Sequence, residues 1–269
     1  MLDKIIHKYL GFPYILNIYR HRRSRNNRPT ILLLHGIGST GAAWNIVLDY
    51  IPKDVGLIVV DLLGFGESPK PKWPVYSAQH QARALRATLR RLAQKQPLII
   101  VGHSMGALIA VEFAQYYPNL VDRLILCSPP FYDHSKKSLL DADEHYRRLY
   151  SAIQHKKQVV LPILSNLSRS PIISDSFDIN EKNIDIYMSA LNASIVNQHS
   201  LELAKKIPIT QVIIHGRFDP IVITKNLKAI IKTNPKARLR NIMAGHEVIG
   251  KYVTAVKQEI LEAIKESST

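Results

Sequence analysis

Val101-Gly102-His103-Ser104-Met105-Gly106-Ala107 is the stretch that decides the fold of this 269-residue chain. The apolar run Pro97-Leu98-Ile99-Ile100 precedes it, and a helix-like run from Ala107 to Ala114 follows it. A Gly-x-Ser-x-Gly between a β-like and a helical pattern predicts a strand, a sharp turn and a helix, with Ser104 at the apex. Glycines on both sides allow the close backbone approach that such a strained turn needs. The serine hydroxyl would project above a helix N-terminus, whose free N–H groups can bind a developing oxyanion.

The segments on either side of this turn alternate between buried strands and amphipathic helices. Long apolar runs are typical of strands that are buried on both faces, as in a parallel sheet covered by helices. Strands are expected at 29–36, 56–61, 97–103, 124–128, 209–216 and 238–243, and helices at 42–50, 77–94, 107–114, 221–233 and 253–265. This order predicts an α/β fold with a mostly parallel, doubly wound sheet and right-handed crossovers.

Two N-terminal segments precede the alternation. The apolar residues of Leu2–Leu10 have helical spacing, which predicts a short helix packed on the body of the protein. A weak interfacial helix is the alternative interpretation. Tyr14–Tyr19 predicts a strand, and the Arg- and Asn-rich segment 20–28 predicts a hairpin-like connection to the strand that follows.

The strand and helix rhythm changes between residues 131 and 206. Helical patterns lie at Tyr146–Gln154, Val159–Leu167 and Asn183–Asn197, with no buried β-like run among them. We therefore expect a helical cap at 131–206, inserted into a core domain formed by 1–130 and 207–269.

Composition narrows the class of protein. The chain is 46% hydrophobic, carries a formal charge of +15 and has a single cysteine, Cys127. One cysteine excludes an internal disulfide and a Cys-rich zinc site, and its place at the end of a strand favours a buried thiol. Because the N-terminus lacks the apolar core of a secretory signal and no run is long enough to span a membrane, we expect a cytoplasmic protein.

The excess of positive charge has two interpretations. Arginines of the segment 20–28 and of the predicted helix 77–94 favour solvated surfaces, with an anion-facing surface as the alternative. No nucleic-acid-binding signature accompanies them, so no nucleic-acid partner is expected. An anionic membrane surface remains a candidate for weak contact.

Ser104 requires a base and an acid that orients the base. In open α/β sheets, functional side chains lie in loops that follow the carboxyl ends of strands. Asp219 follows the strand at 209–216, and His246 follows the last strand in a Gly-His turn. The chain order serine, aspartate, histidine is that of hydrolases with this kind of turn. Other histidines fit structural or solvated roles, with His215 expected in the core.

The chain resembles the α/β-hydrolase superfamily, specifically small serine hydrolases with a helical lid. His35-Gly36-Ile37-Gly38 is similar to the family's oxyanion loop, and Asp61 to Ser68 is similar to its D-x-x-G-x-G-x-S turn. The segments 102–106, 216–219 and 245–246 resemble its nucleophile, acid and base loops. The resemblance implies catalysis by Ser104, Asp219 and His246, with an oxyanion hole made by the backbone N–H groups of Ile37 and Met105.

The same resemblance implies no cofactor, and no metal-ligand spacing is evident in the sequence. The first expectation is cleavage of an acyl ester of a small or lipid-like substrate. Alternatives are a carbon–carbon bond hydrolase acting on a diketone-like acid, and a binding protein that keeps the triad without turnover. The serine at the turn separates the chain from dehalogenase and epoxide-hydrolase relatives, which carry an aspartate there. Substrate choice belongs to the cap, which the sequence does not specify, and the oligomeric state is equally open.

Overall fold

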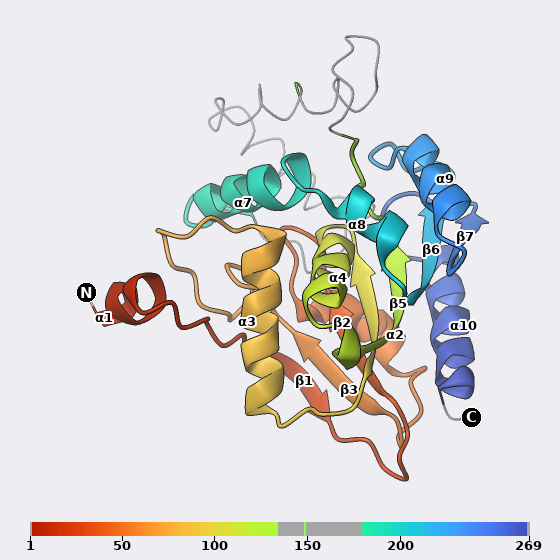
Figure 1. Cartoon of the computed structure of the whole chain (residues 1–269), viewed down its shortest axis with the longest axis horizontal. Coiled ribbons are helices and arrows are strands. Elements are labelled where there is room, and N and C mark those ends of the chain that lie inside the picture. Colours follow the sequence, from red (N-terminus) through yellow and green to blue (C-terminus); the bar gives the residue numbers. More distant parts are fainter. Residues whose placement is uncertain (1, 134–147, 149–178, 268–269) are drawn as a thin grey trace.

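A seven-stranded sheet forms the centre of the computed structural model, which describes residues 2–133, 148 and 179–267 (Figure 1). The strands lie in the order β1-β3-β2-β4-β5-β6-β7. All neighbouring strands are parallel except β1, which runs antiparallel to β3. The bounds are β1 Ile18–Arg22, β2 Thr30–Leu34, β3 Gly56–Val60, β4 Leu98–His103, β5 Val121–Cys127, β6 Thr210–Gly216 and β7 Ala237–Ile242. The predicted α/β fold with a mostly parallel sheet is confirmed.

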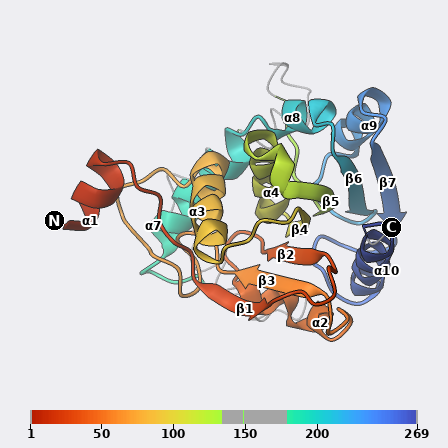
Figure 2. The same cartoon turned by 60° about the horizontal axis from the view of Figure 1, so that its bottom comes forward.

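Helices cover both faces of this sheet (Figure 2). The α-helices are α1 Leu2–Lys4, α2 Asn45–Leu48, α3 Ala78–Arg91, α4 Met105–Tyr116, α7 Ile184–Ala190, α8 Ser200–Lys206, α9 Thr224–Thr233 and α10 Lys251–Glu266. Short π or 3-10 turns are η1 Ile5–Tyr9, η2 Gly41–Trp44, η3 Pro118–Leu120 and η4 Leu191–Val196. The helix expected at 42–50 is therefore a 3-10 turn followed by a single α-helical turn.

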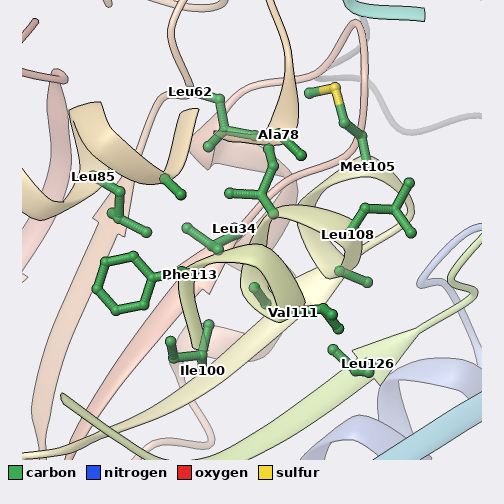
Figure 3. Packing of buried hydrophobic residues seen from close by; sticks show 14 of the residues in the cluster. Leu34, Leu62, Ala78, Leu85, Ile100, Met105, Leu108, Val111, Phe113 and Leu126 are labelled. Carbon is green, nitrogen blue, oxygen red and sulfur yellow. The ribbon is translucent and has the colours of Figure 1, made fainter. Parts of the chain in front are cut away.

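Two hydrophobic cores result from the alternation of side chains along each strand. Leu32 and Leu34 of β2 face the core beneath α3 and α4, whereas Ile31 and Leu33 face the core beneath α2 and α10. Figure 3 shows Leu34, Leu108 and Val111 among the side chains packed around α4. Both faces of the central strands are thus buried, as their uninterrupted apolar runs predict.

The hairpin-like connection predicted at 20–28 is wrong. β1 starts at Ile18, later than predicted, and pairs with β3 rather than with β2. The physical reason is that β2 already has a parallel neighbour on each side, β3 and β4. It has no free edge for β1, which instead adds to the outer edge of β3.

The N-terminal prediction of a packed helix is also wrong. Neither α1 nor η1 has a buried residue, and the apolar side chains Leu2 and Tyr9 are exposed. The polar side chains Asp3 and His7 make the contacts with the body instead, through Tyr14 and Trp73. The apolar side of the segment is consequently left in solvent.

Part of the expected cap lies within the described residues. The helix predicted at Asn183–Asn197 is confirmed as α7 and η4, while the helices predicted at 146–154 and 159–167 lie outside the described residues. Ser194 Oγ donates a hydrogen bond to the Tyr76 carbonyl at 2.7 Å, which ties η4 to the loop after β3. The division into core and cap stays a prediction.

Among the described residues, no helix is both long and apolar enough to cross a bilayer.

Candidate active site

Ser104 occupies the apex of a strained turn between β4 and α4. Its backbone has φ 51° and ψ −117°, a conformation that residues with a side chain rarely adopt. A Cβ built on Gly102 would lie 2.5 Å from the Gly106 carbonyl oxygen, and one on Gly106 would lie 2.4 Å from the Leu34 carbonyl oxygen. Both glycines are therefore required by close backbone approach, as the sequence predicts.

The candidate acid and base are joined by a hydrogen bond. Asp219 follows β6 and His246 follows β7, and His246 Nδ1 lies 2.8 Å from Asp219 Oδ2. The other carboxylate oxygen, Oδ1, accepts the backbone N–H groups of Ile221 at 2.9 Å and Val222 at 3.3 Å. With Nδ1 donating to the carboxylate, the Nε2 atom of a neutral His246 is left as the proton acceptor.

Electrostatics keep Asp219 ionised although its side chain is fully buried. Burial by itself raises the pKa of this carboxyl, but the hydrogen bond and charge of His246 oppose that effect. The Ile221 amide and the Ser128 hydroxyl also favour the charged form, and together these groups hold the pKa of Asp219 below its usual value. A buried carboxylate of this kind can orient a histidine and stabilise its protonated form.

Backbone contacts bind the acid loop to the base loop. The Phe218 N–H donates to the Ala244 carbonyl at 3.0 Å, and the Arg217 N–H donates to the Ile242 carbonyl at 2.8 Å. A Cβ on Gly216 would lie 2.2 Å from the Gly245 carbonyl oxygen, so only glycine fits there. The relative position of Asp219 and His246 is thus set by main-chain packing as well as by their own hydrogen bond.

His103 connects the turn at Ser104 to the base loop. Its Nε2 donates to the His246 carbonyl at 3.0 Å, and the two imidazole rings have centroids 5.1 Å apart. Burial lowers the pKa of His103, which favours the neutral ring. Between Ser104 Oγ and His246 themselves the structure has no hydrogen bond. Such contacts are often long before substrate binds and tighten in the complex.

Two backbone N–H groups flank the candidate nucleophile. Ile37 follows β2, and Met105 is the first residue of α4. Within the part of the chain that the structure describes, no group accepts a hydrogen bond from either N–H. A Cβ on Gly36 would lie 3.4 Å from the Ser104 Cβ, so the loop of Ile37 passes directly beside the serine. Free donors in this position are available to an anion.

Other polar residues near the site have structural roles. Asp61 accepts hydrogen bonds from the Gly41 N–H at 2.7 Å and the Glu67 N–H at 2.9 Å, and these bonds brace its turn. His215 is buried and pairs with Asn241, which confirms the expected core histidine. Cys127 is fully buried, and burial raises the pKa of its thiol, so it is not a reactive group.

Sequence reasoning missed Ser128 and Tyr252. The Ser128 Oγ lies 3.1 Å from the Tyr252 hydroxyl, which donates to the Ile214 carbonyl at 2.7 Å. Ser128 also favours the ionised form of Asp219. Its position directly after β5, on the same sheet edge as Asp219, is a signal that could have identified it. Tyr252 lies in α10 and gives no such signal.

One group of potential metal ligands exists among the described residues. Ligand atoms of His103, His246 and Glu247 lie within 4.8 Å of one another. Hydrogen bonds bring the two rings together, since His246 Nδ1 bonds Asp219 and His103 Nε2 bonds the His246 carbonyl. The geometry is therefore explained by the arrangement of the base loop on the turn.

Known proteins share this architecture. A family model described as alpha/beta hydrolase fold matches residues 29–156. An uncharacterised protein of Mycobacterium tuberculosis is 40% identical over 119 residues, which cover 44% of this chain and 34% of that protein. The probable lysophospholipase BODYGUARD 4 of Arabidopsis thaliana is 34% identical over 107 residues, which cover 39% of this chain and 26% of that protein. The chain thus spans about a third or less of the length of these curated relatives.

A solved structure extends the likeness to almost the whole chain. A thermophilic esterase from Thermogutta terrifontis aligns with a TM-score of 0.71 at 22% identity, covering 94% of this chain and 95% of that one. At this identity the likeness concerns the fold. Together with the family match and the parallel sheet whose carboxyl edge carries the serine turn, it shows that the chain has an α/β-hydrolase fold.

Proposed function

We propose that the protein is a serine hydrolase that cleaves a carboxylic ester bond of a small or lipid-like acyl substrate. The observation that carries the proposal is the hydrogen bond between Asp219 and His246. The carbonyl of His246 is in turn hydrogen-bonded to His103, the residue before Ser104. The strained backbone of Ser104 supports it, because such strain persists where a side chain must be held for function.

In the proposed reaction, His246 Nε2 takes the proton of Ser104 Oγ while the oxygen attacks the acyl carbonyl. The carbonyl oxygen becomes an oxyanion that the N–H groups of Ile37 and Met105 stabilise, each worth roughly 3–4 kcal/mol in the transition state. His246 then gives the proton to the departing alcohol, and an acyl-enzyme remains. Water, activated by the same histidine, releases the acid and restores Ser104. No cofactor enters this scheme.

The name of the Arabidopsis relative, a probable lysophospholipase, supports an ester of a lipid-like molecule as the substrate. Apolar side chains of α7 and η4, in the segment expected to form the cap, belong to the same large buried cluster as Met105, so the expected cap is apolar on the side that packs against the body.

A panel of p-nitrophenyl esters of increasing chain length tests the proposal. We expect turnover by the wild type and none above background by Ser104→Ala, with thermal unfolding as the control for folding. The rates along the panel would rank short against lipid-like acyl groups. Ligand binding without turnover would instead favour the non-catalytic alternative, and turnover of a diketone-like acid but of no ester would favour carbon–carbon cleavage.

A further inference from the structure

The N-terminal segment 2–12 turns its large apolar side chains toward solvent. The side chains of Leu2, Tyr9, Leu10 and Phe12 are 70%, 72%, 63% and 60% exposed. Amphipathic helices usually bury such residues against the body of the protein. Figures 1 and 2 show α1 projecting from the body on the side of α3.

Polar contacts hold the segment in this inverted orientation. Asp3 Oδ2 accepts hydrogen bonds from the Tyr14 hydroxyl at 2.8 Å and from Trp73 Nε1 at 3.2 Å. The ring of His7 stacks on Tyr14 with centroids 3.7 Å apart, and its Nδ1 bonds the Phe12 carbonyl at 2.7 Å. Because the polar side faces inward, the apolar side is available to another surface.

An arginine-lined groove adjoins the end of this segment at Phe12. An open hollow of about 700 Å³ lies between the chain at Phe12 and α3, and Arg83, Arg86 and Arg90 contribute to its wall. The three arginines recur at helical spacing on one side of α3. The Arg86 guanidinium lies over the ring of Tyr117, 5.7 Å from its centroid.

The sequence around this groove is poor in carboxylates. The sequence has no Asp or Glu between Asp3 and Asp49, and none between Glu67 and Glu112. In the described part of the chain, no carboxylate forms an ion pair with an arginine of the groove. Asp3, the one acidic residue of the segment, is engaged with Tyr14 and Trp73.

We propose that these residues form a docking face for an anionic lipid bilayer. Leu2, Tyr9, Leu10 and Phe12 enter the interface, while the arginines of the groove bind lipid phosphates. The exposed apolar side chains match the acyl region of a bilayer, and the arginines match its anionic headgroups. The inference concerns binding and does not depend on the proposed hydrolysis.

Sedimentation with vesicles tests the docking face directly. We expect the full chain to bind phosphatidylcholine vesicles that contain phosphatidylglycerol, to bind pure phosphatidylcholine weakly, and to be released by salt. Ser104→Ala should bind as well as the wild type, which separates this inference from the proposed function.

Two pairs of substitutions at exposed positions should weaken binding. Arg83→Gln with Arg90→Gln should lower the partition coefficient about thirtyfold, and Leu10→Ser with Phe12→Ser at least about tenfold. The matched control, Arg23→Gln with Arg25→Gln, removes the same charge from the exposed connection between β1 and β2. It should retain most of the binding.

Three results would overturn the inference. One is equal binding to neutral and anionic vesicles, and another is an equal loss for the groove and control pairs, which would indicate net charge alone. The third is a dimer in sedimentation velocity that dissociates with Leu10→Ser and Phe12→Ser, since the apolar residues would then cover a second copy of the chain.

Discussion

At Ser104 the backbone conformation and the two neighbouring glycines depend on one another. The turn brings the carbonyl oxygens of Gly106 and Leu34 to within 2.5 Å and 2.4 Å of positions where a Cβ would stand on Gly102 and Gly106. A side chain at either position forces the backbone apart and with it the serine.

Gly102→Ala should therefore destabilise the protein. We expect a loss of about 1–3 kcal/mol in the free energy of unfolding, as for other overpacked sites, measured by urea denaturation. Gly245→Ala is the matched control, because a Cβ there meets no atom within 4 Å. Equal stabilities of the two variants would mean that the turn is not as tight as described.

Asp219→Asn tests the orientation of the candidate base. The amide would offer an N–H toward His246 Nδ1 in place of a carboxylate, so the imidazole would favour the tautomer whose Nε2 carries the proton outward. We expect kcat for an ester to fall about 10⁴-fold, with little change in folding by circular dichroism. Asp49→Asn, at an exposed position, should keep its activity; a similar rate in both variants would rule out the proposed acid.

At the scale of elements, β7 carries the base loop and depends on α10 for support. Glu259 of α10 is 2% exposed, and its carboxylate bonds Arg238 and Arg240 of β7. Arg238 also bonds the exposed Glu262. A buried carboxylate with two arginine partners therefore attaches the last strand to the helix.

Glu259→Gln should loosen that attachment. We expect a loss of about 1–3 kcal/mol of stability and faster hydrogen exchange in β7, because the charge-assisted bonds of a buried group are weakened. Glu262→Gln should change stability by less than about 0.5 kcal/mol, since its side chain is mostly in solvent. Comparable effects in both variants would place the support of β7 elsewhere.

The elements differ in how far the sequence predicts them. Strands such as β2 and β4 are evident because burial on both faces requires uninterrupted apolar runs. The edge strand β1 is predicted with the wrong bounds and the wrong partner, because its pattern of half-buried residues is weak and its partner depends on which edge is free. The segment Leu2–Leu10 has the right period for a packed helix, yet Asp3 and His7 decide which side faces inward.

The residues of the candidate site also differ in how far the sequence predicts them. Ser104, Asp219 and His246 lie directly after strands, where chain order alone locates them, and the structure joins the last two. Ser128 and Tyr252 act through packing between β5, β6 and α10, and such contacts across the fold leave no local pattern.

For the molecule as a whole, buried histidines couple stability to pH. His35 is fully buried, its Nε2 accepts the Leu62 N–H, and burial lowers its pKa from 6.5 to about 4. Between these values the unfolded chain binds a proton that the folded protein does not, so stability falls as the pH falls. Burial lowers the pKa of His103 in the same direction.

We expect the free energy of unfolding to drop by about 2 kcal/mol for His35 alone between about pH 7 and about pH 5. Urea denaturation at both pH values measures this drop, which should shrink in His35→Gln and persist in the exposed-site control His21→Gln. An unchanged drop in His35→Gln would show that other groups cause the acid sensitivity.

Covalent labelling tests the central claim, that Ser104 is a nucleophile activated by His246 and Asp219. A fluorophosphonate should modify the folded wild type once, with the added mass on the peptide that contains Ser104. Ser104→Ala should stay unlabelled, and His246→Ala should label at least about 10³-fold more slowly. Modification of the folded wild type at a residue other than Ser104 would contradict the account. Labelling of His246→Ala as fast as the wild type would contradict it as well.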